Sequence, residues 1–572
     1  MNVYISIKKI TTLCAVRKVW MKLTKKLRWI TILICISLFA VSCSNTGTEE
    51  MENPQQTQEE QTEETPIEPK KGGEMVLSIR TPKTLNPLLN EEYTVDQISK
   101  LIFDTLIDFD ETQKPIPNLV SEWTFSDDGT VLTLNLRSDV KWHDGEPFTA
   151  KDVIFSLDTI KKAPESATYK KCIENITSYK AIDEHSLKII YNQPFSGALY
   201  GLYFPVIPAH IYANQTETTA GEVKPIGTGA YMFSEFIPTK ELNLTVNNNW
   251  FKGQPYIERI KVLITPDEET DLYSFEQGQL DVIGTDVIDW EKYSEQENTR
   301  IHEYITSYYD FMGLNFNKSL FQDKNLRKAI AYSIDRETLL EKQYLNHGVV
   351  TNSPINPESW LYDSETEQYH FNQEKSKQIL MDAGWSDTDS DGLLDKLING
   401  SKVNLSFNLL VSSENLQRKE VAYEIQRMLS EVGINVQVEE VTQEEFLNRL
   451  QSKNFDAFLG GWKLSPIPDF TFAFHSSQID GGANYVSFRS EQMDTLLKQA
   501  FTAVGEEKMK NAYGNLQKFI ADELPYISLY FRTAALITNE KIQGEIKPKK
   551  ESIIGNIQDW FIVEKESALG NN

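Results

Sequence analysis

An acidic run in the second half of the chain has the spacing of a calcium-binding loop. It reads Asp387-Thr-Asp389-Ser-Asp391-Gly392-Leu-Leu-Asp395, and its first three aspartates and its glycine fit the early positions of an EF-hand loop. The bidentate glutamate expected at the twelfth position is Ile398 here, and loss of that ligand weakens such a site. We therefore expect a solvated Asp/Gly turn, with a calcium site as the alternative.

Sequence motifs of enzymes are missing from the chain. The nucleophile elbow G-x-S-x-G, the zinc motif HExxH and the phosphate-binding G-x-x-x-x-G-K-[ST] do not occur. The seven histidines are scattered and form no i, i+4 pair, so we expect neither a histidine-built metal site nor a cofactor. The sequence predicts a protein that is not an enzyme.

The composition is that of a globular protein with a strong acidic excess. The chain has 572 residues, of which 40% are hydrophobic, and a formal net charge of −26. Because domains usually contain ~100–200 residues, this length predicts two or three of them. Nucleic acids and anionic lipid surfaces attract basic proteins, so we expect neither as a partner of the folded part.

The N-terminus has the pattern of a bacterial export signal. Four basic residues between Lys22 and Arg28 precede an apolar run over 29–41, which is shorter than the ~20 residues needed to span a membrane. The run leads into Ala40-Val41-Ser42-Cys43, which resembles a lipobox although Ala40 replaces the usual leucine. We expect a signal peptide over 1–42, with Met21 as an alternative start, and lipidation of Cys43 that holds the protein on the outer face of the cell membrane. A plain signal anchor is the alternative.

Removal of this signal would remove two of the four cysteines of the chain. Cys14 and Cys35 lie in the signal, and Cys172 would remain as the single thiol without lipid. No CxxC spacing occurs, which excludes a thioredoxin-like motif and a zinc ribbon. We therefore expect an exported protein that is stabilised by its core and has no intramolecular disulfide.

Hydrophobic periodicity predicts alternating strands and helices after an acidic tether. Residues 43–73 are rich in Glu, Gln, Thr and Pro and are expected to be disordered. Strands are predicted over 75–80, 131–137, 186–191, 403–410 and 435–441. Helices are predicted over 95–103, 150–160, 326–340, 374–383 and 420–432. This mixture indicates a multi-domain α/β protein with mixed sheets.

An ordered set of residues between 117 and 153 carries a family resemblance. The segments are Pro117-Asn-Leu-Val-Ser-Glu-Trp123, Ser126-Asp-Asp-Gly129, Leu134-Asn-Leu-Arg137 and Val140-Lys-Trp-His-Asp-Gly145-Glu-Pro-Phe-Thr-Ala-Lys-Asp-Val153. They resemble the signature region of the family-5 extracellular solute-binding proteins, which are the oligopeptide, dipeptide and nickel receptors of ABC importers. Further landmarks extend the resemblance over 74–563, among them Leu85-Asn-Pro87, Gly227-Thr-Gly-Ala-Tyr231, Gly278-Gln-Leu-Asp281, Ile334-Asp-Arg336, Gly461-Trp462 and Leu524-Pro-Tyr526.

The resemblance implies the α/β fold of a periplasmic-binding-protein type II clamshell, with two lobes, mixed sheets, a hinge and an extra inserted domain. Lobe I is then expected in residues 74–103, 223–311 and 531–563. The inserted domain with the signature is expected in 104–222, lobe II in 312–530 and a tail in 564–572. In this fold a ligand contacts both lobes only after they close, so its binding energy shifts the open and closed populations.

The same resemblance indicates candidate ligand-binding residues near the Gly461-Trp462 landmark. Peptide receptors of this family usually place an aspartate a few residues beyond it, which binds the α-ammonium of the peptide. The third position after Trp462 is Ser465 here, and the surviving acid is Asp469, which we expect to anchor the amino terminus. Trp462 is expected in the cleft wall or, alternatively, in the core. Asn484 and Tyr485 are expected to contribute polar groups to the cleft.

Within the signature, Trp142, His143, Asp144 and Gly145 are expected to form a structural turn, with a metal or haem ligand role for His143 as the alternative.

The function implied by the resemblance is peptide capture for import. We expect a monomeric, membrane-anchored lipoprotein that binds peptides by hinge closure and delivers them to the permease subunits of an ABC transporter. Two alternatives stay open, a nickel or metallophore receptor of the same family and a signalling or adhesion lipoprotein that uses the same clamshell without transport.

Overall fold

The computed structural model describes residues 68–213, 220–296, 298–398 and 401–563. The predicted signal peptide, Cys43 and most of the tether therefore lie outside the described residues, as does the predicted tail. No helix within the described ranges is long and apolar enough to cross a membrane.

A seven-stranded sheet forms the centre of the described chain. Its strand order is β11-β19-β12-β18-β16-β17, and β13 pairs with β19 beside this path. The strands are β11 (Val282–Thr285), β12 (Thr299–Leu314), β13 (Gly348–Val350), β16 (Ser406–Ser412), β17 (Asn435–Val441), β18 (Ala457–Lys463) and β19 (Tyr526–Asn539). The pairs β16–β17 and β16–β18 are parallel, and β12 runs antiparallel to both β18 and β19, so the sheet is mixed.

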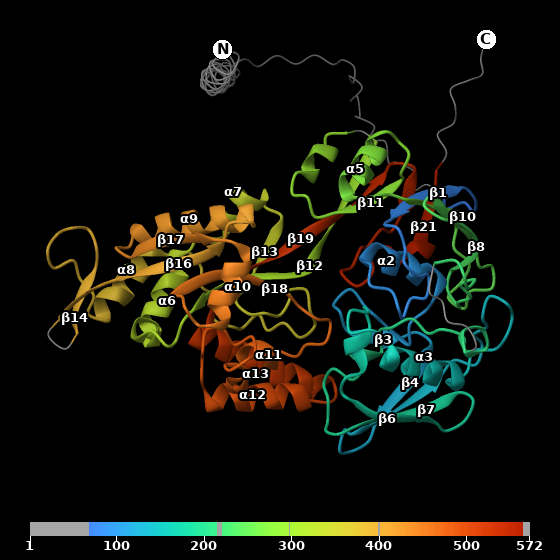
Figure 1. The fold of residues 1–572 in the computed structure, drawn as a ribbon, viewed down its shortest axis with the longest axis horizontal. Coiled ribbons are helices and arrows are strands. Elements are labelled where there is room, and N and C mark those ends of the chain that lie inside the picture. The colour runs from blue at the N-terminus through green and yellow to red at the C-terminus, as the bar shows by residue number, and fades with distance from the viewer. Residues whose placement is uncertain (1–67, 214–219, 297, 399–400, 564–572) are drawn as a thin grey trace, which may run out of the picture. The chain divides into compact units, whose positions relative to one another are not determined.

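The long strands β12 and β19 connect two parts of this sheet. Figure 1 shows them passing side by side from the region of α9 to the region of α5 and β11. Their pairing register shifts between Ile305 and Tyr309 and again between Asp310 and Phe311. Such irregularities bend a strand and interrupt its ladder. Both predicted lobe boundaries, 311/312 and 530/531, fall inside these two strands, and the boundaries themselves stay a prediction.

Two four-stranded sheets accompany the central one. The first has the order β1-β10-β9-β8, with β1 (Glu74–Ile79) parallel to β10 (Arg259–Ile264), and it includes β9 (Glu241–Val246) and β8 (Tyr231–Ile237). The second has the order β4-β5-β7-β6, formed by β4 (Val120–Phe125), β5 (Val131–Leu136), β7 (Ser186–Tyr191) and β6 (Ile176–Ala181). The pairs of short strands are β2 (Ile107–Phe109) with β3 (Pro115–Pro117), β14 (Asp395–Ile398) with β15 (Ser401–Asn404), and β20 (Ile542–Gly544) with β21 (Trp560–Ile562).

Helices cover these sheets and supply the remaining core. They are α2 (Tyr93–Ile102), α3 (Ala150–Lys162), α4 (Ala209–Tyr212), α5 (Glu268–Glu276), α6 (Lys324–Ser333), α7 (Arg336–Tyr344), α8 (Gln373–Asp382), α9 (Leu416–Ser430), α10 (Gln443–Gln451), α11 (Thr471–Phe474), α12 (Glu491–Thr502) and α13 (Glu506–Glu523). One apolar cluster surrounds α6, α7, α9 and β16, and another includes residues of β5, α2, α12 and α13.

Several predicted elements have other bounds in the structure, and the helix predicted over 420–432 runs over 416–430. The helix predicted from 95 begins at Tyr93, because the Glu92 side chain accepts hydrogen bonds from the backbone of the first turn. The helix predicted over 326–340 is two helices, since Ile334 is extended and Asp335 caps α7. The strand predicted over 403–410 divides into β15 and β16 because the chain changes partner at Leu405, from β14 to β17.

Candidate ligand-binding site

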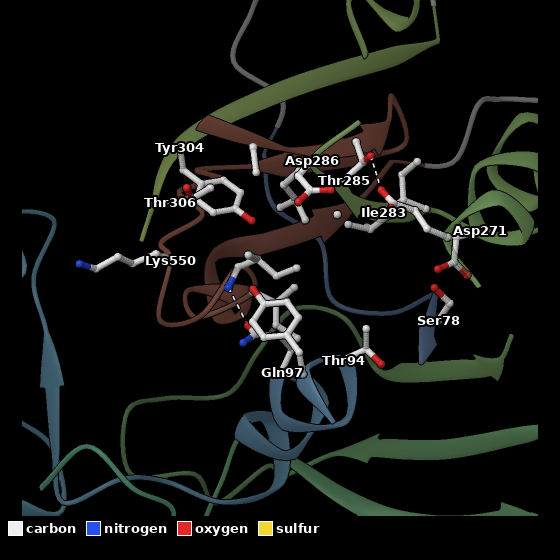
Figure 2. A pocket seen from close by; sticks show the side chains of 18 of the residues that line it. Ser78, Thr94, Gln97, Asp271, Ile283, Thr285, Asp286, Tyr304, Thr306 and Lys550 are labelled. Carbon is white, nitrogen blue, oxygen red and sulfur yellow. Dashed lines mark hydrogen bonds between the residues drawn. The ribbon is translucent and has the colours of Figure 1, made fainter. Parts of the chain in front are cut away.

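Two adjoining cavities lie against the middle of β12. The first has a volume of about 360 Å³ and the second of about 330 Å³, and both are lined by Asp286, Thr306 and Tyr308. The first cavity, drawn in Figure 2, is lined from β1, α2, α5, β11, β12 and β19 and by Lys463 at the end of β18. The second is closed by Tyr344, His347, Gln417 and Arg532. Their volumes lie in or near the range of small-ligand sites, ~300–1,000 Å³.

Most charged groups on the wall of the first cavity have partners. Arg80 Nη1 donates to Asp271 Oδ2 and to Thr265 Oγ1, each at 2.7 Å. The Thr285 hydroxyl donates to Glu268. Lys550 Nζ donates to Gln113 at 3.0 Å. These groups therefore make the wall polar, and each of them already has a hydrogen-bond partner within the protein.

Lys463 lies on the wall of the first cavity, where its ammonium group faces two aromatic rings from other elements. Its ammonium lies 5.8 Å from the ring centroid of Tyr93, which is on α2, and 5.7 Å from that of Tyr308, which is on β12. A cation over an aromatic face is attracted by the ring quadrupole, with a stabilisation of about 0.5–1 kcal/mol at exposed sites. Lys463 immediately follows Trp462, so the Gly461-Trp462 landmark leads directly to the cavity wall.

A buried ion cluster supports the wall of the second cavity. Asp310 on β12 is 2% exposed and accepts a hydrogen bond from Arg418 Nε at 3.0 Å. Its other carboxylate oxygen lies 3.0 Å from Arg532 Nε, and the Arg532 guanidinium stacks 4.4 Å from the ring centroid of Tyr308. Gly461 leaves space for this cluster, since a Cβ there would lie 2.6 Å from Arg418 Nη2. We call Asp310, Arg418 and Arg532 the hinge ion cluster.

Trp462 lies in a cluster of aromatic side chains beside the cavities. Its ring centroid is 4.1 Å from that of Phe311 and 4.9 Å from that of Tyr526, and it is partly buried. Among the described residues it does not line either adjoining cavity. This position agrees with the packing alternative for Trp462, and its role as a cleft wall stays a prediction.

Asp469 lies in a loop that is held by a hydrogen bond from Tyr513 of α13. Its Oδ1 accepts a hydrogen bond from Thr471 N at 2.9 Å, and the side chain is partly buried. The Tyr513 hydroxyl donates to the neighbouring Pro468 carbonyl at 2.7 Å and lies 2.9 Å from the Ser196 hydroxyl. Asp469 retains carboxylate capacity for a ligand, although it lines neither adjoining cavity in the described conformation. Its anchoring role stays a prediction.

The two remaining candidates have different environments. Asn484 is fully buried, and its side-chain amide donates to the carbonyl oxygens of His475 and Phe488 and accepts from Phe488 N. This amide therefore holds a loop together in the described conformation. Tyr485 is partly buried beneath the Lys453 ammonium, 5.3 Å from its ring centroid. Ligand binding by Asn484 and Tyr485 stays a prediction.

Comparison with known proteins decides the family. The family model described as bacterial extracellular solute-binding proteins, family 5 Middle, matches residues 114–483. The chain belongs to the family-5 bacterial extracellular solute-binding proteins. The oligopeptide-binding protein AppA of Bacillus subtilis is 28% identical over 94% of this chain and 99% of its own length.

Solved structures of family-5 proteins share the fold. The B. subtilis AppA structure, solved in complex with a nonapeptide, has a TM-score of 0.59 at 27% identity and covers 87% of this chain and all of its own. NikZ of Campylobacter jejuni, solved in complex with Ni(L-His), has a TM-score of 0.62 at 24% identity and covers 86% of this chain and all of its own. The mixed α/β two-lobe clamshell that the sequence predicts is therefore confirmed.

The family-5 signature segment forms a turn packed against the glycine landmark Gly227-Thr-Gly229. His143 Nε2 lies 3.0 Å from the Gly229 carbonyl oxygen, and Gly227 N donates to His143 Nδ1 at 3.2 Å. These partners require a neutral ring with its proton on Nε2. Both ring nitrogens are thus engaged by backbone, which is the structural-turn role predicted for His143.

The stability of this turn is expected to depend on pH. Burial lowers the pKa of His143 to about 4, whereas the unfolded chain titrates near ~6.5. Between these values the unfolded chain binds the proton that folded His143 excludes, so the free energy of unfolding falls as the pH falls from ~6.5 to ~4, by about 2–3 kcal/mol. Urea unfolding across this range should show a smaller pH dependence for His143→Gln than for the wild type. Equal dependence in the two proteins would remove His143 as the cause.

The acidic run at 387–395 forms a loop whose carboxylates are paired with a lysine of the same chain. Carboxylate oxygens of Asp387, Asp389 and Asp395 lie within 4.8 Å of one another. Lys402 makes ion pairs with Asp389 and, at 3.2 Å, with Asp395, and Asp387 accepts hydrogen bonds from the backbone of Asp391 and Gly392. These contacts form the Asp/Gly turn that the sequence predicts, and Lys402 pairs with two of its aspartates. The calcium alternative stays a prediction.

Several residues of the cavity walls and of the hinge ion cluster carried no sequence signal. Asp286, Asp310, Arg418 and Arg532 come from four separate segments and have neither motif nor spacing in common. Lys463 is the exception, because it directly follows Trp462.

Proposed function

We propose that this protein binds peptides between its two lobes and delivers them to the permease of an ABC importer. The observation that carries the proposal is a pair of adjoining cavities lined from both ends of the β12–β19 crossing, in a chain of the family-5 solute-binding proteins. The relatives support a peptide as the ligand, since one is named an oligopeptide-binding protein and its structure holds a nonapeptide.

Hinge closure supplies the physical basis of capture. The irregular pairing of β12 and β19 provides a flexible connection, and a ligand that contacts residues on both sides stabilises the closed state. A shift from 1:99 to 99:1 in favour of closure requires about 5.5 kcal/mol of differential affinity. Extended peptides can supply it through main-chain hydrogen bonds that do not depend on side-chain identity.

We further propose that Cys43 carries the lipid that holds the protein on the outer face of the membrane, with the acidic stretch 43–73 as a tether. The lipobox-like Ala40-Val41-Ser42-Cys43 supports this assignment. A lipid anchor would keep the receptor near its permease, while the negative net charge would keep the folded part away from anionic lipid.

Native mass spectrometry of the purified protein tests the ligand class. We expect co-purified peptides, seen as a series of adduct masses lost on mild unfolding. A single nickel-containing adduct would instead support the metallophore alternative, for which the Ni(L-His) complex of NikZ is the relevant precedent. A protein that retains no adduct and binds no peptide from a mixed pool would contradict the proposal.

The Asp469 anchor is tested by calorimetry with the peptides so identified. If Asp469 binds the α-ammonium, Asp469→Ala should weaken peptide affinity tenfold or more, since a charge-assisted hydrogen bond contributes about 1.5–3 kcal/mol. Acetylating the peptide amino terminus should weaken binding to the wild type and have little effect on the variant. Asp480→Ala, which removes an exposed acid in the same region, is the matched control. Unchanged affinity in Asp469→Ala would exclude the anchor.

A further inference from the structure

The segment 104–222, predicted as the inserted domain, is fixed to the residues predicted as lobe I. The chain enters it from α2 and leaves it toward β8, so both of its ends join that lobe. The Tyr169 hydroxyl donates to Asp96 Oδ1 at 2.6 Å, and both side chains are buried. His143 of the same segment bonds to the backbone of the turn at 227–229. We therefore expect this segment, which we call the insert, to move together with lobe I.

The insert also packs against α12 and α13, which belong to the predicted lobe II. Ser196 N donates to the Phe501 carbonyl oxygen at 2.7 Å, and the ring centroids of Phe195 and Phe501 lie 4.9 Å apart. Ser196 and Phe195 are only 6% and 2% exposed. At the edge of this contact, Lys114 Nζ lies 2.6 Å from Glu506 Oε2. The contact therefore excludes water at its centre and carries an ion pair at its rim.

Two consecutive hydrogen bonds cross this contact and end at the loop that carries Asp469. The Tyr513 hydroxyl on α13 donates its single proton to the Pro468 carbonyl oxygen at 2.7 Å. The same hydroxyl then accepts from the Ser196 hydroxyl, which lies 2.9 Å away on the insert. Burial raises the pKa of Tyr513, which is 1% exposed, so the phenol keeps its proton. The insert, α13 and the candidate ligand loop are thereby connected.

Separation of the two lobes would break this connection. When the lobes open about β12 and β19 and the insert stays with lobe I, the Ser196 hydroxyl leaves Tyr513. The apolar side chains of Phe195 and Phe501 then meet water. Loss of a buried hydrogen bond and exposure of apolar surface both cost free energy, so the contact stabilises the closed state relative to the open one.

We propose that Ser196, Tyr513 and the Pro468 carbonyl form a latch between the insert and lobe II, which holds the closed receptor around its peptide. The latch deepens the proposed function and rests on it. It sets how slowly a bound peptide leaves, because the contact must break before the lobes open. The latch retains peptides of different sequence alike, since its bonds join protein groups only.

Dissociation rates test the latch. The full-length protein is loaded with a mixed pool of short synthetic peptides, and their loss after dilution is followed by native mass spectrometry. Tyr513→Phe should raise the dissociation rate about tenfold, because it removes both hydrogen bonds. Ser196→Ala should raise it about fivefold. The double variant should not exceed Tyr513→Phe, since the second change removes the hydroxyl that the first leaves unpaired.

Ser196→Ala separates a latch from simple support of the loop. Tyr513 keeps its hydrogen bond to Pro468 in this variant, so a merely structural role would leave the dissociation rate unchanged. Tyr231→Phe is the matched control. Tyr231 is fully buried, and its hydroxyl donates to the Ile257 carbonyl oxygen at 3.1 Å, within the predicted lobe I. This variant should lose stability but keep the wild-type dissociation rate.

The exposed ion pair at the rim gives a second test that leaves the buried contact intact. Lys114→Glu should raise the dissociation rate about two- to threefold, and Lys114→Glu/Glu506→Lys should restore it, because the swapped charges attract again. An unchanged rate in Ser196→Ala, or a rate that the swap fails to restore, would overturn the latch while the wild type still reports peptide binding. A wild type that binds no peptide of the pool would overturn the proposed function and the latch together.

Discussion

Replacing Asp310 by alanine is expected to lower the free energy of unfolding by about 3–5 kcal/mol. Asp310 is the single acid of the hinge ion cluster, and both Arg418 and Arg532 depend on it. Removing one partner of a buried ion pair leaves an uncompensated charge, and here it leaves two guanidinium groups side by side. Their side chains are 17% and 26% exposed, so water can only partly replace the lost carboxylate.

Urea unfolding of the variant measures this loss. Asp139→Ala, which removes one partner of an exposed pair with Arg137, is the control and should change stability by less than about 1 kcal/mol. The double variant Asp310→Ala/Arg418→Ala should be less destabilised than the sum of the two single variants, because the second change removes one of the stranded charges. A loss below about 1 kcal/mol in Asp310→Ala would show that the cluster contributes no net stability.

Replacing Gly227 by alanine is expected to prevent native packing between α2 and the turn that holds the signature. A Cβ at Gly227 would lie 1.7 Å from the Ile102 carbonyl oxygen, at the end of α2. Gly227 also bonds His143 through both its N–H and its carbonyl, so the backbone cannot move away without breaking these hydrogen bonds. Because the obstructing atom belongs to the backbone, no side-chain rotation relieves the clash.

The expected result is a low yield of soluble protein or a loss of more than about 3 kcal/mol in unfolding free energy. Gly278→Ala separates this clash from ordinary backbone strain. Gly278 has a φ of +70°, and no atom lies within 4 Å of the position that a Cβ would take there. Its replacement should therefore cost only about 1–2 kcal/mol, the penalty of a left-handed residue. Similar losses for the two variants would contradict the steric explanation.

Particular elements show how far local pattern predicts this fold. The strands at 186–191 and 435–441 occur at their predicted bounds, because alternation on a half-buried surface is a local property. The helix predicted over 326–340 is broken at Ile334, where Asp335 caps a second helix, and the strand predicted over 403–410 divides where Leu405 changes partner. Caps and changes of strand partner depend on residues that apolar periodicity does not register.

The sequence by itself determined the family and the mixed α/β class, and it predicted the structural role of the signature turn. Each rests on residues close together in the chain, and their order is enough to recognise them. Only the tertiary structure decided that Asp310 lies between Arg418 and Arg532 and that Asn484 is sealed among backbone groups. It also decided that the hydroxyls of Ser196 and Tyr513 meet. Most of these facts depend on which distant segments of the chain meet. Pairing of this kind follows from packing and strand register, which local spacing does not specify.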